Sequence, residues 1–182
     1  MIITDERLLR TKCEDAQLKE TGEIISLLER ELKNSARLGR PGIGLAAPQC
    51  GINKNIAIIR IEDFNFDLVN CKIANKYDKI IFKDEGCLSF PNTVIDTIRY
   101  NEVHIINNLV YPHAFIATGL LSVAISHELD HLNGVLFMDN EVPKLVPAIN
   151  KNKVGTNDPC PCGRIDDLTG KIKKYKKCCM RI

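Results

Sequence analysis

The feature that most restricts the fold of this chain is an apolar segment that runs directly into a charged cluster. Residues 119–126 read GLLSVAIS, and the next five residues read HELDH. A helix that is apolar on nearly every side is a buried helix, and Asn133-Gly134 is a typical helix stop. We therefore expect a central helix between about Thr118 and Asn133 that carries polar side chains into the interior.

The HELDH segment matches the H-E-x-x-H pattern of helical metal sites. His127 and His131 are four residues apart, so both imidazoles lie about 40° apart on one face of a helix and can reach one metal ion. Glu128 lies on the adjoining side, where it can take a proton from a water molecule beside the metal. A solvated charge cluster is the alternative, but the apolar residues before it favour burial.

A tetrahedral site that keeps one position for water needs a third protein ligand. Cys87 is the candidate, because it follows Gly86 directly after a predicted strand, and glycine permits a sharp turn that presents the thiolate. For a lone cysteine, the alternative is a small buried hydrophobic residue. The scattered Cys13, Cys50 and Cys71 are expected to be packing residues.

The remaining patterns indicate an α+β fold. A helix with a wide apolar stripe is predicted from Thr11 to about Leu38, before Gly39-Arg40-Pro41-Gly42 stops it. Short β-branched or aromatic runs predict strands at 56–61, 66–69, 79–82 and 103–106. We expect mostly antiparallel strands around the central buried helix in a domain that covers residues 1–142.

The end of the chain differs in composition and predicts a second, smaller unit. A linker is expected at 143–154, followed by a module at 155–182 that is too short to fold without a staple. Four cysteines in this module, a C-x-C pair and a C-C pair, can close a tetrahedral zinc site. They are Cys160, Cys162, Cys178 and Cys179. Four free or oxidised cysteines are the alternative.

Charge is distributed unevenly between these two parts. Residues 1–150 carry 16 Lys and Arg against 20 Asp and Glu, whereas residues 151–182 carry nine against three. A basic tail favours anionic partners such as the ribosome, nucleic acid or lipid headgroups, although many short basic runs are simply solvated. No segment approaches the ~20 apolar residues of a membrane span, and acidic residues come too early for a signal peptide. We expect a cytoplasmic protein.

Three segments, in this order, resemble the motifs of peptide deformylases: GIGLAAPQ at 42–49, EGCLS at 85–89 and HELDH at 127–131. The resemblance continues through 119–121 and 135–139 and covers most of residues 1–142. It implies a metal-dependent hydrolase that removes the N-formyl group from the formyl-methionine of nascent polypeptides. In such an enzyme a metal-bound water attacks the formyl carbon.

Matched residue by residue, the resemblance assigns the metal to Cys87, His127 and His131, and the general acid/base role to Glu128. The family commonly uses Fe(II), but a Cys-His-His site suits Zn(II), Ni(II) and Co(II) as well. The side-chain amide of Gln49 and the backbone N–H of Leu88 would stabilise the developing oxyanion.

The resemblance also implies a peptide-binding surface. Gly42-Ile43-Gly44 lacks side chains at two positions, which lets an extended substrate backbone approach; a tight turn is the alternative. The apolar pocket for the methionine side chain would be lined by Ile43, Leu120, Val123 and Ala124, although core packing explains the same residues.

Two positions beside the motifs carry separate expectations. Ser126 stands where the family usually has glutamine, which removes an amide that could orient a metal ligand. Arg99 is expected to form an ion pair with Glu85 or Asp130 behind the metal site, with an exposed arginine as the alternative.

The C-terminal module resembles the small zinc-binding (SEC-C) module at the end of the SecA translocation motor, through NDPCPCG at 157–163 and KKYKKCC at 173–179. The middle, at 164–172, is longer than in that module. We predict that this basic module docks the enzyme on the ribosome or another anionic partner. An inactive adaptor and a general H-E-x-x-H peptidase are the alternative functions; a zinc deaminase is excluded by the spacing of its motif.

Overall fold

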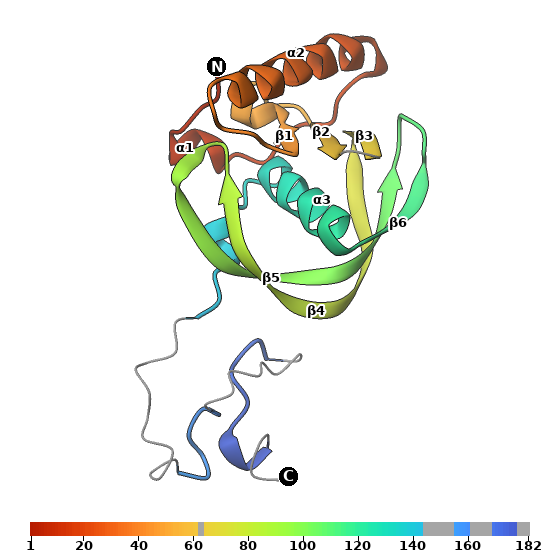
Figure 1. The fold of residues 1–182 in the computed structure, drawn as a ribbon. Helices are drawn as coiled ribbons and strands as arrows, with labels where there is room; N and C mark the ends of the chain where they lie inside the picture. The colour runs from red at the N-terminus through yellow and green to blue at the C-terminus, as the bar shows by residue number, and fades with distance from the viewer. Residues whose placement is uncertain (62–63, 144–154, 161–168, 178–182) are drawn as a thin grey trace. The chain divides into compact units, whose positions relative to one another are not determined.

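The computed structural model describes residues 1–182 except 62–63, 144–154, 161–168 and 178–182 (Figure 1). The chain forms two compact units, Met1–Val142 and Pro143–Ile182. None of the helices in the described residues is both long and apolar enough to cross a membrane. Cys162, Cys178 and Cys179, three of the four predicted zinc ligands, lie outside the described residues.

The first unit is a mixed α/β fold with two antiparallel sheets and few helices, as the sequence predicts. One sheet has the order β1-β2-β3, and the other has the order β4-β5-β6. The strands are β1 (Gly44–Ala46), β2 (Ile56–Ile61), β3 (Phe64–Val69), β4 (Cys71–Cys87), β5 (Phe90–Asn107) and β6 (Ala114–Thr118). The α-helices are α1 (Glu6–Leu9), α2 (Leu18–Arg37) and α3 (Gly119–Leu132), and the short 3-10 turns are η1 (Ala47–Cys50), η2 (Phe137–Asn140) and, in the second unit, η4 (Tyr175–Lys177).

Strand β2 separates two hydrophobic clusters because successive side chains of a strand point to opposite faces. Ala57 and Ile59 belong to the cluster that includes Ile125 and Leu129 of α3. Ile56 and Ile58 belong to the cluster built on the apolar stripe of α2. The first sheet therefore lies between α2 and α3, as Figure 1 shows.

The long hairpin of β4 and β5 curves around α3 (Figure 1). Register shifts occur between Ile73 and Asn75, between Phe82 and Glu85, and between Gly86 and Cys87. Such bulges bend a strand and redirect its side chains. The last two shifts lie on either side of Glu85 and Gly86 at the end of β4. The strand therefore bends at this point, and the bend directs side chains of β4 toward α3.

One predicted helix begins later than its apolar pattern suggests. Helix α2 starts at Leu18 and not at Thr11, and the backbone N–H of Gln17 donates to the Glu20 carboxylate at 3.1 Å, which caps the first turn. The preceding stretch forms tertiary backbone contacts instead: Cys13 N–H donates to the Leu132 carbonyl, and Glu14 bridges to Lys54. Helix α3, in contrast, agrees with its predicted range within one residue at each end.

Candidate metal centre and active site

Cys87 at the end of β4 meets two histidines of α3. One ligand atom from each of Cys87, His127 and His131 lies within 4.8 Å of the other two, and Cys87 Sγ is 3.2 Å from His131 Nε2. In a tetrahedral site with metal–sulfur bonds of about 2.3 Å and metal–nitrogen bonds of about 2.0–2.1 Å, sulfur and nitrogen ligands lie roughly 3.6 Å apart. The three side chains therefore fit a single divalent metal ion in spacing and in chemistry.

A buried ionic network holds His127 from behind. His127 Nδ1 contacts Glu85 Oε1 at 2.6 Å, and Arg99 Nε donates to Glu85 Oε2 at 2.8 Å. Arg99 also reaches Asp130 Oδ2 at 2.5 Å, so it contacts both of the carboxylates that the sequence suggested. Burial raises the pKa of Glu85, but hydrogen bonds from Arg99 and His127 outweigh burial and lower the pKa to about 2. Glu85 is therefore ionised near neutral pH and orients His127 with Nε2 toward Cys87 and His131.

The electrostatics of the two histidines suit a cation between them. Burial lowers the pKa of His131 to about 3, so its imidazole stays neutral, which is the form that binds metals. Burial also lowers the pKa of His127, but contacts with Cys87 and Glu85 raise it to about 10 on balance. Negative surroundings that stabilise a proton on His127 also stabilise a metal ion there.

Glu128 points into the same space without a complete set of partners. Its Oε2 atom and Nδ1 of His131 are two of the three buried side-chain polar atoms that lack a hydrogen-bond partner within the described residues. Such orphaned atoms are rare in proteins and mark places where water, an ion or a ligand binds. Burial raises the pKa of Glu128 to about 7, which suits a group that takes up and releases a proton near neutral pH.

Gly44 gives Glu128 its space. A Cβ atom at position 44 would lie 2.5 Å from Oε1 of Glu128 and 3.0 Å from its Cδ atom. The sequence suggested that this glycine admits a substrate backbone, but the neighbour that requires it in the structure is the Glu128 carboxylate. The spacing of the motifs in the sequence does not predict this contact between Gly44 and Glu128.

Gln49 is fixed in η1 with its amide directed at the metal centre. Its Oε1 accepts a hydrogen bond from the Ala46 N–H at 2.9 Å, which leaves Nε2 to donate to Ser89 Oγ at 3.2 Å and to Cys87 Sγ at 3.5 Å. Leu88, which is partly buried, follows Cys87 in the turn between β4 and β5. Ser89, buried at the same turn, is a site residue that we did not single out from the sequence.

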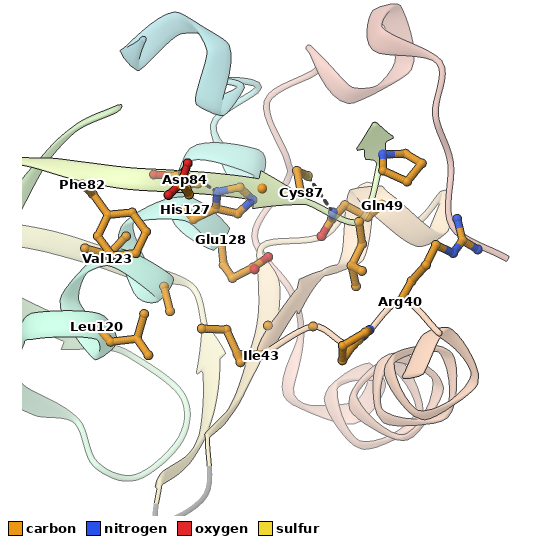
Figure 2. A pocket seen from close by; sticks show the side chains of 18 of the residues that line it. Arg40, Ile43, Gln49, Phe82, Asp84, Cys87, Leu120, Val123, His127 and Glu128 are labelled. Carbon is orange, nitrogen blue, oxygen red and sulfur yellow. Dashed lines mark hydrogen bonds and ion pairs between the residues drawn. The ribbon is translucent and has the colours of Figure 1, made fainter. Parts of the chain in front are cut away.

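A pocket of about 450 Å³ opens beside these groups (Figure 2). All four residues expected around the methionine side chain line it: Ile43 and Leu120 are 40% and 49% exposed at its rim, and Val123 and Ala124 are buried. Other lining residues, which no motif indicated, include Arg40, Phe82, Asp84 and Pro91. They come from segments whose sequence patterns read only as turns or strands.

Ser126 does not reach the metal centre. Its hydroxyl donates to the Ser122 carbonyl one turn back along α3, at 2.8 Å. Ser126 is buried and lies next to His127 in the chain, but within the described residues its only hydrogen-bond partner is the helix backbone.

Comparisons with known proteins agree with this geometry. A family model described as polypeptide deformylase matches residues 1–146. Peptide deformylase 1 of Bacillus subtilis is 40% identical over 133 residues, which cover 67% of this chain and 82% of that protein. A peptide deformylase of Microchaete diplosiphon is 36% identical over 154 residues, which cover 78% of this chain and 82% of that protein.

Solved structures give the same result. The crystal structure of a peptide deformylase from Synechococcus elongatus in complex with actinonin has a TM-score of 0.69 at 34% identity, and covers 80% of this chain and 79% of that one. A probable peptide deformylase from Synechococcus phage S-SSM7 has a TM-score of 0.66 at 33% identity, and covers 77% and 98% of the two chains. This chain therefore belongs to the polypeptide deformylase family.

Proposed function

We propose that Cys87, His127 and His131 hold the catalytic metal with which this peptide deformylase removes the formyl group from nascent peptides. The convergence of the three ligands beside Glu128, whose Oε2 has no hydrogen-bond partner within the described residues, is the observation that supports this assignment. When bound, a divalent metal polarises the formyl oxygen and lowers the pKa of a water molecule. Fe(II) is the metal we propose, and Zn(II), Ni(II) and Co(II) are compatible with the same donors.

Glu128 is the general acid/base in this proposal. Its carboxylate accepts a proton from the attacking water, whose oxygen forms a bond to the formyl carbon. The same carboxyl group then returns the proton to the nitrogen of methionine as the carbon–nitrogen bond breaks, and formate and the free amine leave. Burial of Glu128 and a pKa near 7 allow both transfers without a large energetic cost.

Gln49 and Leu88 stabilise the charge that develops on the formyl oxygen. The Gln49 amide is already oriented by its bond to Ala46, so it does not have to reorganise when the charge appears. The Leu88 backbone N–H is the second donor. The methionine side chain binds among Ile43, Leu120, Val123 and Ala124, and the backbone of the peptide lies along Ile43 and Gly44.

Anaerobic hydrolysis of a formyl-methionine peptide tests this assignment. We expect the purified protein to release formate, and Glu128→Ala to lose nearly all activity while it retains its metal, because Glu128 is not a ligand in this proposal. An unformylated peptide of the same sequence distinguishes a deformylase from a general peptidase and should stay intact. Formate release by Glu128→Ala at the wild-type rate would contradict the assignment.

We also propose that residues 155–182 form a SEC-C-type zinc module with Cys160, Cys162, Cys178 and Cys179 as ligands, after a linker at 143–154. Contacts in the described part of this unit support the idea. Cys160 is fully buried, its N–H donates to the Lys173 carbonyl at 2.8 Å, and Pro159 bridges to Lys174. Cys160 is thereby held beside the lysine run that precedes Cys178 and Cys179 in the sequence.

The total metal content of the full chain, with zinc and iron measured separately, tests the module. Two metal ions per chain are expected, and Cys160→Ser should lose one of them while formate release persists. Cys13→Ser, a buried cysteine of the first unit, serves as the matched control and should retain both. A wild-type protein with one metal ion per chain would contradict the proposal.

The basic charge of this unit suggests its partner. We propose that it docks the enzyme on the ribosome, in the cytoplasm, where formylated nascent chains emerge. Co-sedimentation with ribosomes at low salt should be lost when residues 151–182 are deleted, and high salt should release the full chain as well. Co-sedimentation that survives the deletion would contradict this proposal.

A further inference from the structure

Arg40 has a defined position at the edge of the active-site pocket. Its N–H donates to the Ser35 carbonyl at 2.9 Å, and its carbonyl accepts a hydrogen bond from Ser35 Oγ at 2.7 Å. Ser35 is 3% exposed and belongs to α2, and Gly39, with a φ of 78°, makes the turn between the helix and Arg40. The backbone that carries the guanidinium is therefore anchored, although the side chain itself is exposed.

The charge of Arg40 is uncompensated in the described parts of the chain. Arg10, Arg60 and Arg99 each contact two carboxylates, whereas no ion pair involves Arg40 within the residues that the structure describes. Arg40 nevertheless lines the pocket that contains Glu128. An exposed arginine that lines a binding pocket and has no internal partner is available to a carboxylate of the ligand.

The pocket has an apolar end, and Arg40 lies at the opposite end. Figure 2 shows Leu120, Val123 and Phe82 on one side of Glu128, and Gln49 and Arg40 on the other. Asp84, the exposed carboxylate of the lining, lies on the same side as Phe82. The pocket is thus polarised, so an anionic group is favoured near Arg40 and disfavoured near Asp84.

An extended substrate would bring its first residues after methionine toward Arg40. This step rests on the proposed function, in which the methionine side chain fills the apolar end and the backbone lies along Gly44. Arg40 precedes Gly44 by four positions, and the residues between them also line the pocket; an extended peptide spans about 13 Å with four residues. We infer that Arg40 is a specificity-determining residue that favours formyl-methionine peptides with a carboxylate side chain at their second to fourth residue.

Amidated peptides of the type formyl-Met-Ala-Ala-Ala test this inference, because the amide removes the terminal carboxylate. A single Asp or a single Lys replaces alanine at the second, third or fourth residue, and kcat/KM is measured for each member of a pair. The wild type should prefer Asp over Lys by about two- to fivefold at one or more positions, the range of an exposed ion pair. The preference should shrink at 1 M salt, where the Debye length falls to about 3 Å.

Two arginines provide the matched variants. Arg40→Gln should bring the ratio of Asp to Lys substrates to about one, and Arg40→Glu should invert it. Arg37→Gln is the control, because it changes the net charge by the same amount as Arg40→Gln. Arg37 is exposed in the last turn of α2 and does not line this pocket. The Arg37→Gln variant should keep the wild-type ratio of Asp to Lys substrates. The ratio compares two peptides on one enzyme, so a general loss of activity does not affect it.

Failure of this inference is distinguishable from failure of the proposed function. A metal-loaded wild-type protein that does not deformylate the all-alanine peptide would overturn the proposed function. Activity on that peptide with equal kcat/KM for the Asp and Lys substrates would overturn the role of Arg40 alone. A preference for Asp that persists in Arg40→Gln would overturn it as well.

Discussion

Gly44 and Glu128 lie so close that a Cβ atom at position 44 would be 2.5 Å from Oε1 of the carboxylate. The glycine is on β1 and the glutamate is on α3, so this contact joins the first sheet to the helix that carries both histidines. The position of the proposed general acid/base thus depends on the absence of a side chain on a different element.

Gly44→Ala should therefore cause a large loss of kcat with only a small change in the free energy of unfolding. The added methyl group must displace Glu128, and a misplaced proton-transfer group costs about 10²-fold in rate. We expect kcat to fall by about that factor while metal content stays normal. Gly22→Ala, in the second turn of α2 with no atom within 4 Å of the added Cβ, is the control; it should leave activity unchanged and stabilise the protein by about 0.5–1 kcal/mol. Wild-type kcat in Gly44→Ala would refute the displacement.

Arg99→Ala should destabilise the protein and weaken metal retention. The change leaves the buried Glu85 carboxylate without its cation, which costs about 3–5 kcal/mol, and loosens the ring of His127. Denaturant unfolding and metal analysis after dialysis measure the two effects, and Arg99→Lys should be intermediate because it lacks the planar fork. Lys83→Ala, which removes the exposed ion pair with Asp96, should cost less than about 1 kcal/mol. A stable, metal-retaining Arg99→Ala protein would show that the network is dispensable.

Ser126→Ala should leave the metal centre almost unchanged. The hydroxyl bonds to the Ser122 carbonyl, so its loss changes stability by no more than about 1 kcal/mol and should change kcat/KM by less than about twofold. Formate release under saturating metal provides the measurement. A tenfold loss of activity would mean that Ser126 influences His127 through a contact that the folded structure does not contain.

Removal of the metal by a chelator should abolish activity and lower the melting temperature. A metal that binds only the folded state stabilises it by mass action, by about 2.7 kcal/mol when its concentration is 100 times the dissociation constant. His131→Ala should show a smaller drop on chelation than the wild type, because the site on α3 is already incomplete. Melting curves with and without metal make the comparison; equal drops in both proteins would argue against His131 as a ligand.

Alkaline pH should destabilise the fold partly through Cys71. Burial raises the pKa of this thiol from its ordinary value of 9.0 to about 12, so the folded state keeps its proton where the unfolded chain loses it. The stabilisation is complete below about pH 9 and is lost as the pH rises toward 12, by up to about 1.4 kcal/mol per pH unit. The free energy of unfolding from pH 8 to 10.5 should fall less steeply in Cys71→Ala. Parallel slopes would exclude the thiol as the cause.

Much of the architecture follows from local patterns. The apolar run before His127 predicted α3 within one residue at each end, because a helix that must be buried on all sides leaves few alternatives. The β-branched run at 56–61 predicted a strand, and the structure places its two faces in two different clusters. The four-residue spacing of the histidines was sufficient to put both on one side of the helix.

Long-range contacts account for what those patterns could not supply. The start of α2 at Leu18 depends on Cys13 and Glu14, whose backbones pair with residues far along the chain. Cys87 reaches the histidines because bulges near the end of β4 redirect its side chain, and irregular register has no periodic signal in a sequence. The fit of Gly44 against Glu128 and the exposed guanidinium of Arg40 at the pocket arise in the same way. Periodicity encodes which face a residue occupies, whereas the partner across that face is set by packing between distant segments.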